Sequence, residues 1–178
     1  VKKILLNSLY GAILNPGCRF FDKRIGQSTT LTGRTIVKHM SAEVNKVITG
    51  VYDHTGEAMI YGDTDSCYFS AWPTLKHEIN AGKIPWTKEN VITLYDQVSE
   101  AANVTFPDMM QKSFHCPKSR SDVIAAGREI VAQSGLFITK KRYAALVIDT
   151  EGFRSDVDGK AGKVKAMGLD LRRSDTPV

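Results

Sequence analysis

Residues 59–69 read MIYGDTDSCYF, and this stretch decides how the chain is expected to fold. Its two ends are apolar and rich in β-branched or aromatic side chains, whereas Gly-Asp-Thr-Asp in the middle is typical of a tight turn. The pattern predicts a β-hairpin whose tip carries the carboxylates Asp63 and Asp65. Two carboxylates held about 5 Å apart on a half-buried turn would repel by roughly 3 kcal/mol, a cost that a bound cation reverses. The hairpin is therefore a candidate metal site.

The two aspartates have another interpretation, as solvated turn formers, which is a common role of Asp in loops. A calcium-binding EF-hand loop that began at Asp63 would need Gly at its sixth position and Glu at its twelfth. The chain has Tyr68 and Thr74 there, which argues against a site of that type. A catalytic magnesium site remains, in which carboxylates hold ions that also bind phosphate oxygens. Such a site requires a phosphate-binding group elsewhere in the chain.

The amino-terminal segment supplies a candidate for that group. Residues 1–14 have helical spacing and end at an Asn-Pro-Gly stop signal. Lys3, Asn7 and Tyr10 share one face of this helix, and the row would suit a triphosphate at one end and a nucleobase at the other. The opposite face is apolar and consists of Leu5, Leu6, Leu9, Ala12 and Ile13. An ordinary amphipathic helix with solvated polar residues is the alternative, although Gly11 favours close approach by another surface.

Taken together, these segments resemble a known family. The pattern Lys-x-x-x-Asn-Ser-x-Tyr-Gly at 3–11, followed by Tyr-Gly-Asp-Thr-Asp-Ser at 61–66, resembles the second and third sequence motifs of family B DNA polymerases. Residues 140–144, Lys-Lys-Arg-Tyr-Ala, resemble an element that this family has after its catalytic hairpin. The order and the spacing of the three motifs agree with the family.

Three shorter stretches extend the resemblance over nearly the whole chain. Residues 167–169 and 174–177 resemble the passage from palm to thumb. That tail and the stretch at 19–22 are most similar to the replicative polymerases of tailed bacteriophages. The resemblance is weakest over residues 71–126.

The resemblance implies an α+β fold, in which the antiparallel sheet of a polymerase palm has helices packed on one face. Residues 1–17 would be the C-terminal part of a fingers helix, residues 18–166 the palm, and residues 167–178 the start of the palm-to-thumb passage. The spacing of apolar residues independently predicts helices over residues 22–49, 88–104 and 106–114. Alternating residues predict strands over 128–133, 136–139 and 143–149, with Ser134-Gly135 as a turn. We expect the helix over 22–49 to pack beneath the hairpin.

The resemblance also assigns roles around the reacting groups. Asp65 would be the principal metal ligand and Asp63 a weaker or indirect one. Lys3 and Asn7 would contact the incoming triphosphate. Tyr10 and Gly11 would pack along the minor-groove edge of the nascent base pair, where every correct pair presents acceptors in similar places.

Further along the chain, Lys141, Arg142 and Tyr143 would hold the primer duplex near its 3′ end, with Lys140 beside them. A solvated basic patch is the alternative for this run. On an alternating strand, Lys141 and Tyr143 would share one face and Lys140 and Arg142 the other.

Glu129 matches a place near the metals where family members often have an acidic residue. Gly127, two places earlier, stands where phage relatives commonly have Asp. We therefore expect Glu129 to give electrostatic support rather than to bind metal directly.

Composition and charge agree with a protein that binds a polyanion. The chain has 178 residues, 42% of them hydrophobic, which is enough for one domain core. Counting Lys and Arg against Asp and Glu, the net charge is +6 over residues 1–50, −5 over 51–117 and +4 over 118–178. Two basic segments around an acidic centre would suit a cleft that holds a polyanion beside a cation site, although solvated helix faces would give the same counts.

Three Cys residues without a Cys-x-x-Cys pair indicate neither a disulfide framework nor a structural zinc site. We find neither a signal peptide nor a stretch of membrane-spanning length, and expect a cytoplasmic protein, in the host cytoplasm if viral. The first residue is not Met, and both ends are expected to be cuts through a longer protein.

The function implied for that longer protein is templated addition of deoxynucleotides to a primer 3′ end, with two Mg²⁺ ions as cofactor. Its partners would be primer–template DNA, deoxynucleoside triphosphates and a sliding clamp. The family's first motif, which supplies another metal-binding Asp, would precede residue 1, so the 178-residue chain alone is expected to be inactive. The alternatives are a catalytically incomplete nucleic-acid-binding module derived from a palm, and a polymerase that copies RNA or uses RNA primers. The polymerase hypothesis predicts that the turn acids and the amino-terminal helix converge on one pocket.

Overall fold

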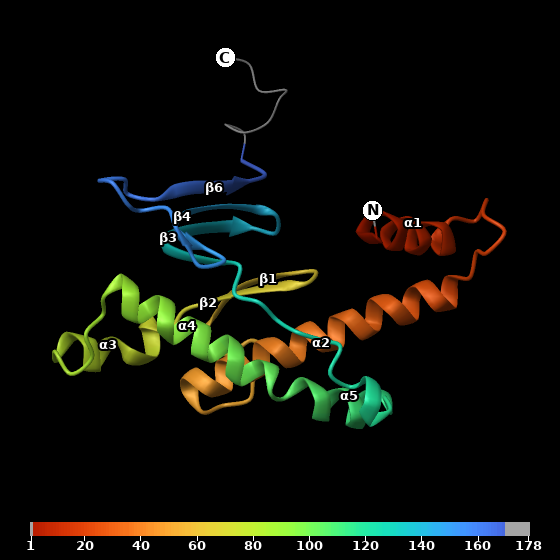
Figure 1. Ribbon diagram of the computed structural model, residues 1–178, viewed down its shortest axis with the longest axis horizontal. Coiled ribbons are helices and arrows are strands. Elements are labelled where there is room, and N and C mark those ends of the chain that lie inside the picture. Colours follow the sequence, from red (N-terminus) through yellow and green to blue (C-terminus); the bar gives the residue numbers. More distant parts are fainter. Residues whose placement is uncertain (1, 170–178) are drawn as a thin grey trace, which may run out of the picture.

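Four of the α-helices, those after residue 22, lie on one side of the β-hairpin, and most helices begin and end where the sequence predicts (Figure 1). The computed structural model describes residues 2–169. Its α-helices are α1 (Lys2–Leu14), α2 (Lys23–Thr49), α3 (Trp72–Asn80), α4 (Lys88–Asn103) and α5 (Phe106–Phe114) (Figure 1). The Asp22 side chain accepts from Arg24 N at the start of α2, and Thr87 accepts from Asn90 N at the start of α4. Local capping thus fixes the N-termini of α2 and α4, whereas α3 and α5 begin without a side-chain cap and with Pro in the first turn.

Two antiparallel sheets, rather than one, make up the β part. The first is the hairpin of β1 (Met59–Asp63) and β2 (Ser66–Phe69). The second has the strands β3 (Ile130–Thr139), β4 (Arg142–Thr150), β5 (Phe153–Arg154) and β6 (Lys163–Met167), and β4 pairs with each of the others. The hairpin lies between this sheet and the helices (Figure 1). The α+β class is confirmed.

The predicted turn at Ser134-Gly135 is wrong. Strand β3 continues through both residues, with Gly135 opposite Ala145, and the chain reverses at Lys140 and Lys141 instead. A Cβ atom at position 135 would lie 2.9 Å from the Phe137 ring, so glycine here makes room for a neighbouring ring rather than for a turn. Strand β3 also begins at Ile130, two residues later than predicted.

The helices are joined to the hairpin and to the second sheet by two small cores. Val44 of α2 packs with Val98 and Ala102 of α4, and Met59 and Phe69 of the hairpin cover this cluster. The prediction that the helix over 22–49 packs beneath the hairpin is confirmed by these contacts. The other cluster joins Val91 of α4 to Val131 and Ile148 of the second sheet. Helix α4 is therefore shared between the two cores.

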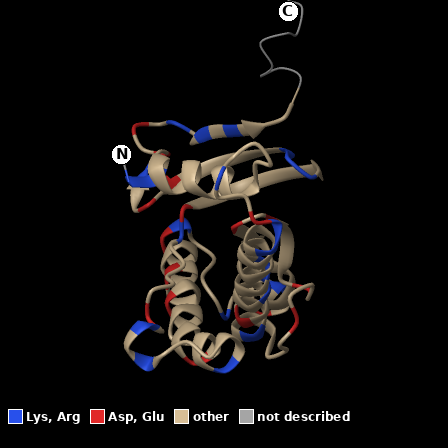
Figure 2. Cartoon of the chain, turned by 90° about the vertical axis from the view of Figure 1, so that its right-hand side faces the viewer, with Lys and Arg blue, Asp and Glu red and all other residues tan. Residues whose placement is uncertain are grey.

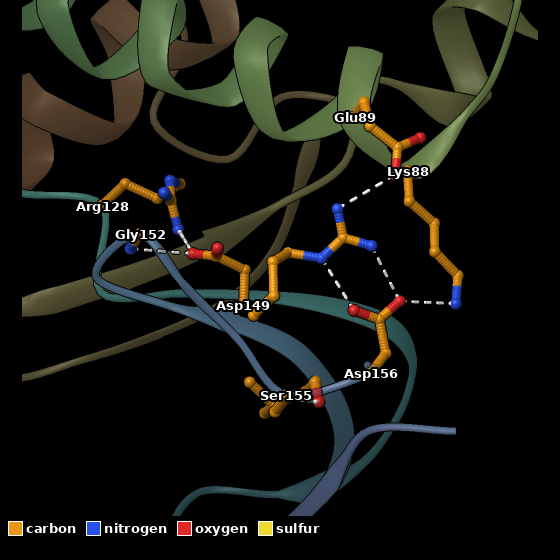
Figure 3. Close-up of polar contacts among 9 residues, drawn as sticks. Lys88, Glu89, Arg128, Asp149, Gly152, Ser155 and Asp156 are labelled. Carbon is orange, nitrogen blue, oxygen red and sulfur yellow. Dashed lines mark hydrogen bonds and ion pairs between the residues drawn. The ribbon is translucent and has the colours of Figure 1, made fainter. Parts of the chain in front are cut away.

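Ion pairs reinforce the contact between α4 and the second sheet (Figure 3). Arg128 binds both Asp96 of α4 and Asp149 of β4, whose Oδ1 also accepts from Gly152 N at 3.0 Å. A second group of ion pairs includes Asp156, which binds Arg154 (Nε–Oδ1 2.7 Å) and Lys88 (Nζ–Oδ2 2.7 Å). Arg154 also forms an ion pair with Glu89 (Nη1–Oε1 3.0 Å). We call these seven charged side chains the ion-pair network: Lys88, Glu89, Asp96, Arg128, Asp149, Arg154 and Asp156.

Helix α1 lies against the N-terminal half of α2, apart from both sheets (Figure 1). It is held by the Tyr10 hydroxyl, 2.7 Å from Thr30 Oγ1, and by Asp22 N, which donates to Ile13 O. Its apolar residues Ile4, Leu5, Leu6 and Leu9 remain 55–70% exposed.

None of the helices formed by residues 2–169 has both the length and the apolar character needed to cross a membrane. The predicted palm-to-thumb passage begins at Met167, the last residue of β6, and its residues 170–178 lie outside the described part of the chain.

Candidate functional site

The carboxylates predicted at the hairpin tip are there. Asp63 pairs with Ser66 across the hairpin, which leaves Thr64 and Asp65 as a two-residue turn. Thr64 has a φ of +36°, and its hydroxyl group donates to Asp63 Oδ1 at 3.1 Å. Asp63 is half-buried, whereas Asp65 is exposed. We call residues 63–66 the carboxylate turn.

The carboxylate turn forms part of the wall of a cavity of about 610 Å³. Apolar side chains of α2, among them Ile36 and Met40, line it from one side, and residues 124–135 line it from another. Asp65 and Glu129 both line this cavity. The Glu129 carboxylate forms an ion pair with Lys165 Nζ of β6 at 2.8 Å, so its charge is compensated by a lysine.

The polar row of α1 lies elsewhere. Lys3, Asn7 and Gly11 are exposed, and Tyr10 is hydrogen-bonded to α2. The cavity has no α1 residue in its lining, and among residues 2–169 no hydrogen bond or ion pair joins α1 to the carboxylate turn. A common pocket of the helix and the turn stays a prediction.

Four aromatic rings connect the hairpin to the second sheet. Tyr61 and Tyr68 face each other across β1 and β2, and Phe137 and Tyr143 do so across β3 and β4. The six centroid distances among the four rings are 5.1–5.9 Å, and Tyr68 Oη donates to Tyr143 Oη at 3.0 Å. Burial and the Tyr143 hydrogen bond raise the pKa of Tyr68 above its usual range, so this phenol stays neutral near pH 7. We call these four residues the ring cluster.

The basic run predicted to hold DNA lies at the β3–β4 turn, next to the ring cluster. Lys140, Lys141 and Arg142 are exposed, whereas Tyr143 is buried with 4% of its surface exposed. Lys140 and Lys141 lie in the turn, so the predicted alternation along a strand does not apply to them. Lys141 N donates to the Tyr61 hydroxyl at 2.8 Å, which ties the run to the strand that ends in the carboxylate turn. We call residues 140–142 the basic turn. Figure 2 shows further Lys and Arg residues on the second sheet. Strand β6 contains Lys163 and Lys165.

Comparisons with known proteins show which sequences this chain resembles. DNA polymerase family B matches residues 1–84. The DNA-directed DNA polymerase of Escherichia phage RB69 is 30% identical over 185 aligned positions that cover 99% of the chain. The chain belongs to DNA polymerase family B. The DNA-directed DNA polymerase of Enterobacteria phage T4 is 26% identical over 99% of the chain, and the DNA polymerase alpha catalytic subunit of Xenopus laevis is 27% identical over 97%. The chain spans 20% of the length of each phage relative.

The carboxylate turn of this family B chain offers ligands of the kind that Mg²⁺ prefers, because carboxylate oxygens are hard donors. It supplies two carboxylates from one turn. Within residues 2–169, no three side chains of His, Cys, Asp or Glu gather closely enough to hold a metal ion. Asp63 and Asp65 therefore fit part of a magnesium site.

Sequence reasoning missed the residues that hold the family B motifs together. Tyr61 and Tyr68 each stand two residues from the Asp63–Ser66 pair, so their cross-strand contact follows from the predicted turn. The contact of these two rings with Phe137 and Tyr143 was not predicted, because the wrong turn at 134–135 interrupted the strand that carries Phe137. Arg128 had no local signal, because its partners Asp96 and Asp149 lie 32 and 21 residues away.

Proposed function

We propose that the protein to which this chain belongs is a DNA-directed DNA polymerase that adds deoxynucleotides to a primer 3′ end. The observation that carries the proposal is the attachment of the basic turn to the carboxylate turn through the ring cluster and the Lys141–Tyr61 hydrogen bond. An acidic turn beside a basic turn can hold cations and a polyanion next to each other. Because the chain belongs to DNA polymerase family B, we propose that this polyanion is a nucleic acid.

In this proposal, Asp65 is the principal metal ligand, because its exposed carboxylate is open to an ion. Asp63 is the weaker ligand, since one of its oxygens already accepts from Thr64. Two Mg²⁺ ions, when bound, would lower the pKa of the primer 3′-hydroxyl and neutralise the leaving pyrophosphate. Asp63 and Asp65 would hold that charge at the tip of the hairpin, where it would help to orient the reacting oxygens.

The exposed row on α1 is proposed to bind the nucleotide. Lys3 would contact the triphosphate as a point charge, and Asn7 would donate to the same region. Tyr10 and Gly11 would lie against the minor-groove edge of the new base pair, with the Tyr10 ring fixed by its bond to Thr30. This role requires α1 to approach the carboxylate turn with substrate present.

The basic turn is proposed to hold the primer. Lys140, Lys141 and Arg142 are exposed and can reach phosphates or the minor groove. Tyr143 is buried, so its part is to support the turn from inside. Glu129, paired with Lys165, would adjust the local charge without binding metal. A sliding clamp as partner and a cytoplasmic location, in the host if viral, belong to the same proposal.

The test uses the longer protein that contains this chain. Asp65→Asn keeps the shape of the side chain and removes its charge, and kcat of primer extension should fall roughly 10²–10³-fold, the scale of losing one group that stabilises transition-state charge. Primer–template affinity should remain largely unchanged. Glu78→Gln on α3 is the matched control, because Glu78 is an exposed acid that does not line the cavity.

Unchanged turnover in Asp65→Asn would refute the metal-ligand role. The 178-residue chain, tested alone, is expected to show no templated extension because its carboxylate turn fits part of a metal site only. Measurable extension by the purified chain would contradict that expectation.

A further inference from the structure

The basic turn has a strained backbone that needs support from outside. Lys141 has a φ of +61°, in the left-handed region that residues with a Cβ atom adopt only at a cost in energy. Its backbone N–H donates to the Tyr61 hydroxyl at 2.8 Å, and Tyr61 lies 80 positions earlier in the chain. An acceptor on another strand therefore holds the turn at its most strained residue.

A third segment passes close to the carbonyl side of the same residue. A Cβ atom at Gly168 would lie 2.1 Å from Lys141 O, and Gly168 has a φ of +64°, so only glycine lets the chain after β6 pass this close. Gly168 O in turn accepts from Arg142 Nε at 3.1 Å. The basic turn is thus contacted from two sides, by the Tyr61 hydroxyl at Lys141 N and by Gly168, which lies close to Lys141 O and accepts from Arg142.

Tyr61 itself is held firmly. Its ring stacks on Phe137 at 5.5 Å with 29° between the planes, and it also contacts Tyr68 and Tyr143. Because Tyr61 stands two residues before Asp63 on β1, its hydroxyl group relates the position of the basic turn directly to that of the carboxylate turn. Tyr68 provides a comparison within the same cluster, since its hydroxyl group is bonded to Tyr143 and, among residues 2–169, has no hydrogen bond to the basic turn.

We propose that Tyr61 is a positioning residue. Its hydroxyl group holds Lys141 at a fixed place relative to Asp65 and so determines how tightly the basic turn binds the primer end. The proposal rests on the proposed function, in which the basic turn binds the primer. Tyr61 acts through Lys141 and needs no contact with DNA of its own.

The experiment uses Tyr61→Phe in the longer protein, because this change removes one oxygen and leaves the ring stacking intact. The Kd for primer–template should rise about five-fold, the equivalent of one lost neutral hydrogen bond, while kcat at saturating DNA stays the same. Hydrogen exchange of the Lys141 amide should become faster, since the amide has lost its acceptor. Tyr68→Phe, the matched control, should change neither the exchange of that amide nor the Kd for DNA.

A double-mutant cycle with Lys141→Ala separates this proposal from the proposed function. If Tyr61 acts through Lys141, Tyr61→Phe adds no further loss of affinity in the Lys141→Ala background. Additive losses, an equal loss in Tyr68→Phe, or faster amide exchange with unchanged Kd would overturn the positioning role. If Lys141→Ala alone leaves the Kd unchanged, the primer-binding role of the basic turn fails, and the positioning role fails with it.

Discussion

The second sheet meets the rest of the molecule at two interfaces, the ring cluster toward the hairpin and the ion-pair network toward α4. The ring cluster contains four uncharged side chains whose contacts are stacked or tilted rings and one bond between hydroxyl groups. The ion-pair network holds the same sheet with charges, several of them hidden from water. The carboxylate turn and the basic turn are joined by the first interface and not by the second.

The difference indicates how the candidate site keeps its geometry. Packed rings have directional preferences, and they do not change charge near neutral pH. Ion pairs depend on salt and on pH, and their attraction has to offset the loss of hydration of both partners. Burial lowers the pKa of Arg128, but the hydrogen bonds to Asp96 and Asp149 outweigh this and raise it. Because the carboxylate turn and the basic turn lie at the uncharged interface, we expect their spacing to be independent of such changes.

Breaking the charged interface should have the largest effect on stability. Arg128 is 10% exposed, and Arg128→Met would leave the carboxylate of Asp149, which is 2% exposed, with the Gly152 N–H as its remaining partner. A buried charge that loses its counterion costs about 3 kcal/mol in the free energy of unfolding. Urea unfolding of the chain measures this loss.

The control for Arg128→Met is Lys112→Met on α5. Lys112 and Asp108 form an ion pair whose side chains are both well exposed, so its loss should change the free energy of unfolding by less than about 1 kcal/mol. If the two substitutions destabilise the chain equally, the ion-pair network contributes no more than an ordinary surface pair.

Sequence reasoning predicted the helices and the hairpin better than the interfaces between them. Helices α2, α4 and α5 and the β1–β2 hairpin were correct, because periodicity, caps and turn residues are local signals. Ser134-Gly135 has the same local signal for a turn, but pairing along β4 and the Phe137 ring outweigh it.

The missed turn had consequences for the site. The true reversal at Lys140 and Lys141 has turn residues without Gly, Pro, Asn or Asp, and it is held by Tyr61 from another strand. No local pattern reports a hydrogen bond across 80 residues, so sequence reasoning proposed candidate site residues but not the contacts that join them. The same applies to Arg128 and its two distant carboxylates.

Acid should also weaken the ion-pair network, and the resulting loss in the free energy of unfolding should be smaller than that caused by Arg128→Met. The hydrogen bonds from Arg154 and then Lys88 hold the pKa of Asp156 well below its ordinary 3.8. A carboxylate with a lowered pKa in the folded state stabilises the fold fully above pH 3.8, and this contribution is lost as the pH falls toward the lowered value. Stability measured from pH 6 downward should therefore fall less steeply below about pH 4 in Asp156→Asn than in the wild type. Identical acid slopes for both proteins would show that Asp156 has no part in the loss.

The smallest effect is expected at the uncharged interface, from Tyr68→Phe. This change keeps the ring and removes the hydrogen bond to Tyr143, so the free energy of unfolding should fall by about 1 kcal/mol or less at neutral pH. Because the pKa of Tyr68 is raised in the folded state, its contribution is present below the ordinary pKa of 10.0 and is lost as the pH rises above that value. Unfolding measured up to alkaline pH should show a shallower loss in Tyr68→Phe, whereas Asp156→Asn should alter the acid side alone. A variant that changed both sides would mean that the two interfaces are coupled through the sheet, and that the spacing of the carboxylate turn and the basic turn depends on the charges around α4.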